Sequence, residues 1–287
     1  MTPYDFLVAP FADYVFMKRA LAAALMIVLA SAPMGVFMSL RRMTLVGDAL
    51  AHALLPGVAA AVLIAGLSLW AMTLGGLVAA LVVAGMAVFL TRTTQIEEDA
   101  AFSILYLFAL AIGVTLVSVK GSGMNLLHLL FGDILAIDEA SLALVAGVTC
   151  ATLVGLAVLY RRLVVEGFDA DYLAVVAAGH PLTGLTHPAF FMLLMLNLVA
   201  SFQTMGTLMA LGLMILPALA ARFWASNIDR IVPLSVVLAA LCSYVGLLLS
   251  YHAGVPAGPA IVLVASSLAL LSALVGRVGS FRNYLQK

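Results

Sequence analysis

Charged residues are scarce in this chain. Only 9% of its 287 residues are Asp, Glu, Lys or Arg, whereas 65% are hydrophobic, and the mean hydropathy is +1.22. Soluble domains carry about 25% charged residues, so this composition excludes a soluble protein and indicates a chain that crosses a membrane several times as helices. The formal net charge is zero, which gives no reason to expect nucleic acid as a partner.

Cysteine and N-terminal basic residues are also scarce. Cys150 and Cys242 lie in separate apolar runs without the spacing of a metal site, so we expect packed thiols rather than a disulfide. The first residues include Asp5 and Asp13 but no basic n-region, so no cleavable signal peptide is expected. The first spanning helix would then direct insertion, with membrane lipid around the whole chain.

A phosphate-binding GxxxxGK[ST] loop is missing. None of the lysines (Lys18, Lys120 and Lys287) follows a glycine, as such a loop requires. If the protein takes part in ATP-driven transport, the ATPase must be a separate polypeptide. In that case the chain itself would be a transport protein rather than an enzyme, with no permanently bound cofactor.

Apolar runs long enough to cross a bilayer, roughly 20 residues each, recur along the chain. We expect spans near 18–40, 45–69, 72–91, 99–119, 139–160, 187–204, 206–225, 231–251 and 257–276. The predicted fold class is all-α, a polytopic transmembrane helical bundle forming one domain over 1–287. Polar residues interrupt the run at 201–225, so eight spans are the alternative to nine. Basic residues fall mostly on one side if the N-terminus is outside, which predicts a cytoplasmic C-terminus.

Two ionisable residues, Asp48 and His52, lie inside the second apolar run. A carboxylate at bilayer depth costs about 3 kcal/mol on insertion scales, so it is rarely without a role. Four residues apart on a helix, the two side chains share one face. Three interpretations stay open: a structural hydrogen-bonded pair, a step in a proton relay, or an oxygen and a nitrogen ligand for Zn²⁺, Mn²⁺ or Fe²⁺. In a symmetric homodimer, two copies would supply four ligands.

Three places interrupt the helical pattern. They are Pro56-Gly57, the polar step Ser201-Phe202-Gln203-Thr204 beside Gly206, and Leu216-Pro217-Ala218. Unwound backbone at membrane depth must face protein or water, so each could mark a transport path. The alternative is that proline and glycine only bend these helices. Gln203 is accordingly an accessory candidate for the path.

Two polar stretches lie outside the spans. Segment 124–138 is too short to cross and is expected on the outer side, where His128 and Asp133 either receive a cation or are simply solvated. The stretch 161–188 is expected to be a cytoplasmic loop with a short alanine-rich helix that suits docking to a soluble partner. The roles of His180 and His252 stay open.

Two other functional classes are weighed. Gly47-Asp48, Gly132-Asp133 and Pro217-Ala218-Leu219 imitate an intramembrane aspartyl protease, but its two carboxylates must lie at one depth and share a proton. Because Asp133 falls in a segment too short to span, this interpretation is disfavoured. A secondary transporter coupled to a proton or sodium gradient is the other alternative.

Six motifs carry a resemblance. In chain order they are RRMTLVGDALAHALLPG, EEDAAFSILYLFALAIG, LLHLLFGDILAID, EGFDADY, SFQTMGTLMALGLMILPALAAR and VPAGPAIVLVAS. Together they resemble the permeases of bacterial zinc/manganese/iron ATP-binding-cassette importers, over about Arg41 to Ser272. The resemblance implies a type II importer permease of the inner membrane: a homodimer with cytoplasmic ATPase subunits and a periplasmic or lipoprotein metal-binding protein.

The resemblance also implies roles for particular residues. Asp48 and His52 match the family's GD-x₃-H motif, which lines the translocation path. The family's ATPase-coupling region carries over onto Gly167, Phe168 and Asp169. Where family members often have Leu-Gly after the coupling helix, this chain has Gly179-His180-Pro181. FGD and the Pro-Ala-Gly-Pro at 256–259 favour the zinc branch, with manganese and iron as alternatives.

Overall fold

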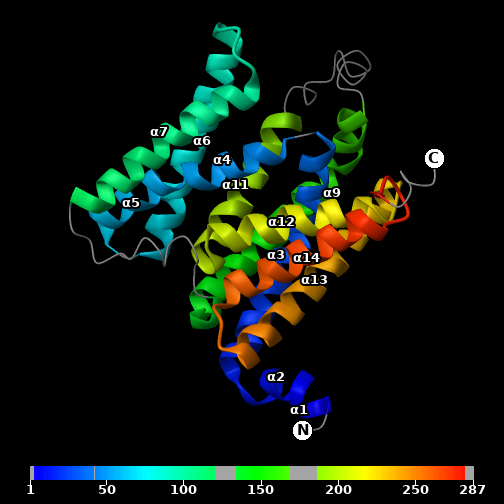
Figure 1. Cartoon of the computed structure of the whole chain (residues 1–287). Coiled ribbons are helices and arrows are strands. Elements are labelled where there is room, and N and C mark those ends of the chain that lie inside the picture. The colour runs from blue at the N-terminus through cyan, green and yellow to red at the C-terminus, as the bar shows by residue number, and fades with distance from the viewer. Residues whose placement is uncertain (1–2, 42, 67, 120–133, 169–185, 282–287) are drawn as a thin grey trace.

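The computed structural model describes residues 3–41, 43–66, 68–119, 134–168 and 186–281, and every regular element in these ranges is a helix (Figure 1). The first helices are α1 (Pro3–Leu7), α2 (Ala9–Asp13), α3 (Val15–Leu40), α4 (Thr44–Ala53), α5 (Leu55–Ala65), α6 (Leu69–Thr93) and α7 (Glu98–Val119). The others are η1 (Ile134–Ala136, a 3₁₀ turn), α9 (Glu139–Phe168), α11 (Thr186–Met205), α12 (Thr207–Arg222), α13 (Ile228–Ala253) and α14 (Ala257–Val275).

The helices form two packing groups. Helices α3, α9, α12, α13 and α14 pack on one another as the main body, while α4, α5, α6 and α7 form a second group beside it (Figure 1). Helix α11 contacts both groups, through α9 and α12 on one side and α6 on the other. Helix α1 and the end of α14 lie at opposite ends of the body (Figure 1), as an odd number of membrane crossings between them requires.

The predicted all-α membrane fold is confirmed. In the described residues, seven helical segments are long and apolar enough to cross a bilayer, among them Val46–Ala65, which joins α4 and α5. Two shorter apolar helices, Ala100–Leu116 within α7 and Thr207–Arg222, bring the spanning candidates to the nine that the sequence predicts. The choice between eight and nine spans depends on the region of α12. This helix has 16 residues, fewer than the roughly 20 that a span needs.

The stretch predicted as a cytoplasmic loop, 161–188, is helical where the structure describes it. Helix α9 continues through Arg161 and Arg162 to Phe168, α11 begins at Thr186, and residues 169–185 lie outside the described ranges. The two arginines end the apolar run but not the helix, since arginine has high helix propensity and its long side chain can extend from an apolar stem towards water.

Two of the three predicted breaks are present. Helix α4 ends at Ala53, and Pro56 occupies the first turn of α5, where its missing N–H leaves no hydrogen bond unmade. Gly206 separates α11 from α12 with φ of 79°, a conformation that other residues rarely adopt. The third prediction is wrong as a break, because Pro217 lies inside the continuous helix α12.

Helices α3 and α12 approach each other closely at Gly35. A Cβ atom at this position would overlap the backbone carbonyl of Met214 and lie 3.3 Å from the Cβ of Ala218. Only glycine lets the two backbones approach so closely, as at other helix crossings in membranes. Gly35 therefore sets the position of α12 against the body.

Gly35→Ala is expected to lower the stability of the protein. The methyl group must push α3 and α12 apart, and such overpacking typically costs roughly 1–3 kcal/mol. Thermal unfolding in detergent, followed by the loss of the monodisperse peak on size exclusion, measures the effect. Gly85→Ala on α6 is the matched control, because nothing lies within 4 Å of its added Cβ. Equal unfolding temperatures for both variants would contradict the close crossing.

Candidate functional site

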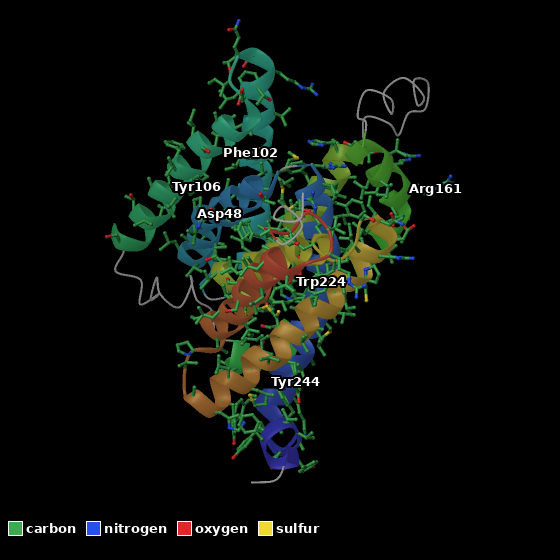
Figure 2. All side chains as sticks on the ribbon, turned by 45° about the vertical axis from the view of Figure 1, so that its right-hand side comes forward. Asp48, Phe102, Tyr106, Arg161, Trp224 and Tyr244 are labelled. Atoms are coloured by element: carbon green, nitrogen blue, oxygen red, sulfur yellow. The ribbon has the colours of Figure 1, made fainter. Side chains whose placement is uncertain are left out.

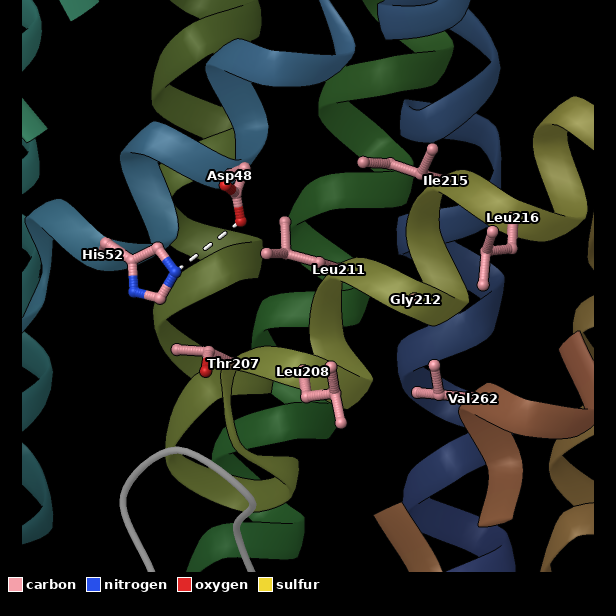
Figure 3. Close-up of a pocket in the computed structure, with 9 residues that line it drawn as sticks. All are labelled: Asp48, His52, Thr207, Leu208, Leu211, Gly212, Ile215, Leu216 and Val262. Carbon is pink, nitrogen blue, oxygen red and sulfur yellow. Dashed lines mark ion pairs between the residues drawn. The ribbon is translucent and has the colours of Figure 1, made fainter. Parts of the chain in front are cut away.

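Asp48 and His52 lie one turn apart on α4 and point into the same space (Figure 3). The Asp48 Oδ1 atom is 3.7 Å from His52 Nε2, too long for a strong hydrogen bond but close enough for both atoms to contact one small cation. Their side chains are 52% and 23% exposed, respectively. The pair predicted from the sequence spacing is thus brought together and left accessible.

The sequence of α4 explains why these two side chains face outward. Val46, Leu50 and Ala53 follow the helical spacing and are buried, and they belong to one hydrophobic core cluster. Asp48 and His52 occupy another face of the same helix. Figure 2 shows Asp48 on α4 beside α7, the helix that α4 contacts most extensively.

A cavity of about 450 Å³ adjoins the pair. Its walls come from α4, from the first three turns of α12 and from α14 (Figure 3). Its lining residues are Asp48, His52, Thr207, Leu208, Leu211, Gly212, Ile215, Leu216 and Val262. Asp48 and His52 are the ionisable members of this lining, so a cation that enters meets an apolar wall with one acidic and one imidazole group.

The His52 ring presents one nitrogen to the cavity. Its Nδ1 atom is fully buried and has no hydrogen-bond partner, and its ring packs near that of Tyr106, with centroids 5.7 Å apart. Nε2 faces Asp48 (Figure 3). A neutral imidazole protonated at Nδ1 would leave the Nε2 lone pair available, which is the form that binds metals.

Asp48 and His52 alone would be an incomplete set of metal ligands. In the part of the chain that the structure describes, no three His, Cys, Asp or Glu side chains gather closely enough to hold a metal ion. Divalent transition metals take four or more ligands. A metal ion bound by this pair would therefore need further ligands from water, from residues outside the described ranges or from another polypeptide.

Among the described residues, the other predicted site residues are not part of this lining. Gln203 accepts a hydrogen bond of 3.0 Å from the Thr73 hydroxyl, and its buried amide nitrogen has no partner.

Gly167 and Phe168 are the last residues of α9. His128, Asp133, Asp169 and His180 lie outside the described residues. His252 stacks on Phe6, with ring centroids 4.1 Å apart, and its Nε2 is 3.0 Å from the Phe6 carbonyl oxygen.

Sequence reasoning missed the contribution of α12 to the site. Thr207 and Leu211 line the cavity, and although they lie within the motif SFQTMGTLMALGLMILPALAAR, nothing in the sequence singles out these two side chains. The Gly206 turn fixes where α12 begins, and thereby brings its first residues opposite α4. A break next to polar residues was the signal for this wall, but it could not indicate which side chains face Asp48.

The all-helical fold, the apolar spans and a polar pair beside an open cavity between helices define a membrane permease. The model of the ABC 3 transport family matches residues 13–276, and the chain belongs to this family. It is 32% identical over 260 residues to the manganese import system permease protein ScaB of Streptococcus gordonii, covering 91% of each chain. It is 30% identical over 261 residues to the manganese transport system membrane protein MntC of Halalkalibacterium halodurans, covering 91% of this chain and 87% of the relative.

A solved structure agrees with these matches. PsaBC from Streptococcus pneumoniae in complex with Fab superimposes with a TM-score of 0.85 at 31% identity, covering 98% of this chain and 99% of the other. The protein is thus the permease of an ATP-binding-cassette metal importer, a multi-pass protein of the bacterial inner membrane. ATP is hydrolysed by a separate subunit, and the importer class includes a substrate-binding partner. The family predicted from the six motifs is confirmed, whereas its zinc branch is not.

Proposed function

We propose that the permease imports a divalent first-row transition metal, with Mn²⁺ as its main substrate, through a path in which Asp48 and His52 bind the ion. The observation that carries this proposal is the convergence of Asp48 Oδ1 and His52 Nε2 at 3.7 Å on an open cavity between membrane helices. A carboxylate and an imidazole in an otherwise apolar wall attract a cation and replace part of its water shell.

Two copies of the chain form the path. Each copy supplies one oxygen and one nitrogen ligand, so a symmetric pair with α4 near its axis offers two Asp and two His. The second copy would close the cavity that Asp48 and His52 line. With four protein ligands and water, the site binds the ion strongly enough for it to enter the path. The binding is also weak enough for the ion to leave again.

Manganese is favoured over zinc for two reasons. The nearby relatives reported above are named for manganese transport. The cavity of about 450 Å³ and the half-exposed Asp48 leave room for water ligands, and oxygen-rich sites with water suit Mn²⁺. Zinc is the second candidate, because two Asp and two His also suit a tetrahedral site. Ferrous iron accepts the same ligands.

Import follows alternating access. A metal-binding protein on the outer side delivers the ion, which passes to Asp48 and His52. The ATPase subunits dock on the cytoplasmic side near Gly167 and Phe168, the last residues of α9, and near the following Asp169. The motif EGFDADY, which resembles the coupling region of the family, supports this position. ATP binding then moves this end of the permease and opens the path inward.

The metal content of cells tests the choice of metal. In a strain that lacks its other manganese and zinc importers, this permease with its ATPase and binding protein should restore manganese accumulation, measured by elemental mass spectrometry. If the permease restored zinc accumulation and left manganese accumulation unchanged, the choice of Mn²⁺ would be wrong. As a control, liposomes that hold the permease alone under a proton or sodium gradient should take up no metal. Uptake there would identify a secondary transporter instead.

A further inference from the structure

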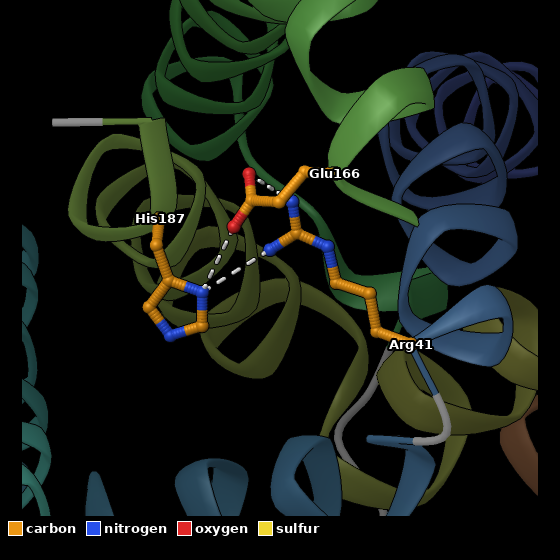
Figure 4. Close-up of polar contacts among 3 residues, drawn as sticks. All are labelled: Arg41, Glu166 and His187. Carbon is orange, nitrogen blue, oxygen red and sulfur yellow. Dashed lines mark hydrogen bonds and ion pairs between the residues drawn. The ribbon is translucent and has the colours of Figure 1, made fainter. Parts of the chain in front are cut away.

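A second polar cluster lies at the junction between α3 and α4 (Figure 4). The Arg41 guanidinium donates a hydrogen bond of 2.8 Å to Glu166 Oε2, and its other terminal nitrogen is 3.3 Å from His187 Nδ1. The same His187 nitrogen is 3.5 Å from Glu166 Oε1. The guanidinium carbon also lies 4.8 Å from the centre of the Phe190 ring, which adds a cation–π contact.

The cluster is buried more deeply than surface ion pairs are. The side chains of Arg41 and Glu166 are only 7% and 15% exposed. Burial lowers the pKa of the Arg41 guanidinium, although the neighbouring Glu166 opposes this effect. Removing both charges from water is costly, so a buried pair of this kind adds little net stability compared with apolar packing. Its value lies in fixing one arrangement of the segments that carry it.

Three segments meet at this point. Arg41 follows the last residue of α3, and α4, with Asp48 and His52, begins three residues later at Thr44. Glu166 is in the last turn of α9, next to Gly167, and His187 is the second residue of α11. The chain passes from the main body into the second packing group directly after Arg41. A shift of the end of α9 would therefore act on the start of α4 through Arg41.

We propose that Arg41, Glu166 and His187 form the link that transmits movement of the end of α9 to α4, and so to Asp48 and His52. The three are positioning residues: none of them touches the metal in this proposal. The inference rests on the proposed function, because it takes the end of α9 as the place where the ATPase acts. Arg41 and Glu166 each begin one of the six motifs, but the resemblance assigns neither of them a role, and His187 lies outside these motifs.

The same two helices carry a second ion pair that lacks these features. Arg19 on α3 and Glu139 on α9 are 2.6 Å apart, and their side chains are 38% and 82% exposed. This pair joins α3 to α9 at their other ends, far along both helices from Arg41 and Glu166. It provides a matched control, because its loss weakens α3–α9 contact without touching the junction with α4.

The test uses the full importer, with its ATPase and binding protein, reconstituted in liposomes. Mn²⁺ is added to the solution outside them. Import and ATP hydrolysis are measured together for Glu166→Gln, for Glu139→Gln and for the charge reversal that combines Arg41→Glu with Glu166→Arg. We expect Glu166→Gln to hydrolyse ATP near the wild-type rate but to import about tenfold less metal per ATP, within the usual range of coupling between sites. The charge reversal should restore most of this ratio, since His187 contacts both partners and accepts either order. Glu139→Gln should leave it unchanged.

Other results would overturn the link. The link is wrong if Glu166→Gln imports as much metal per ATP as the wild type, or if Glu139→Gln loses as much as Glu166→Gln does. It is also wrong if the charge reversal does not restore the amount of metal imported per ATP. A fall of import and hydrolysis together, in step with a lower unfolding temperature, would show a purely structural pair. Asp48→Asn in the same vesicles separates this test from that of the metal site. If Asp48→Asn imports normally, the proposed ligands are wrong, while the metal-per-ATP ratio still decides the link.

Discussion

Asp48→Asn is expected to abolish metal uptake by the assembled importer. The substitution keeps the shape of the side chain but removes its charge, and an amide oxygen binds a divalent cation far more weakly than a carboxylate does. Changes to groups that merely support metal ligands cost about 10- to 100-fold, so the loss of a ligand in each copy should cost at least as much. Mn²⁺ accumulation in liposomes with ATP, at matched permease content, measures the effect.

The control removes a carboxylate of the same kind elsewhere. Asp138 caps the start of α9, where its Oδ1 accepts a hydrogen bond of 2.9 Å from the Ser141 backbone N–H. Asparagine caps helices about as well as aspartate, so Asp138→Asn should fold and import normally. His52→Gln, which removes the imidazole at similar size, should behave as Asp48→Asn does. Wild-type import by both Asp48→Asn and His52→Gln would remove the pair from the path.

Local features of the site were predictable from the sequence because they depend on short spacings. Asp48 and His52 share a face as a direct result of their four-residue separation on a helix. The break after them follows from Pro56, and the break before α12 from Gly206. The nine spans were predicted by comparing the length of each apolar run with the thickness of a bilayer. Each of these depends on residues within a few turns of one another.

Long-range contacts could not be predicted in this way. Arg41 and Glu166 are 125 positions apart, and no local pattern pairs them. Glu166 begins the motif EGFDADY, but nothing in the sequence indicates its partner, because a carboxylate at the end of an apolar run usually faces water. The α12 wall of the cavity, with Thr207 and Leu211, depends equally on how distant helices pack. Such contacts follow from the whole fold, which composition and periodicity do not determine.

A dimer with a single altered copy tests whether two chains share one path. Two permease genes with different affinity tags, one of them Asp48→Asn, allow the mixed dimer to be purified and placed in liposomes with its ATPase.

In the proposed site, four ligands surround one ion, so the mixed dimer loses one of two carboxylates from its only path. Its uptake should fall well below half that of the wild type, by about tenfold or more. Two independent paths, one in each copy, would instead leave about half of the uptake, because the wild-type copy would work alone. A half-active mixed dimer would therefore exclude a shared site. A dimer of two wild-type copies, each with a different tag, is the control for purification and reconstitution.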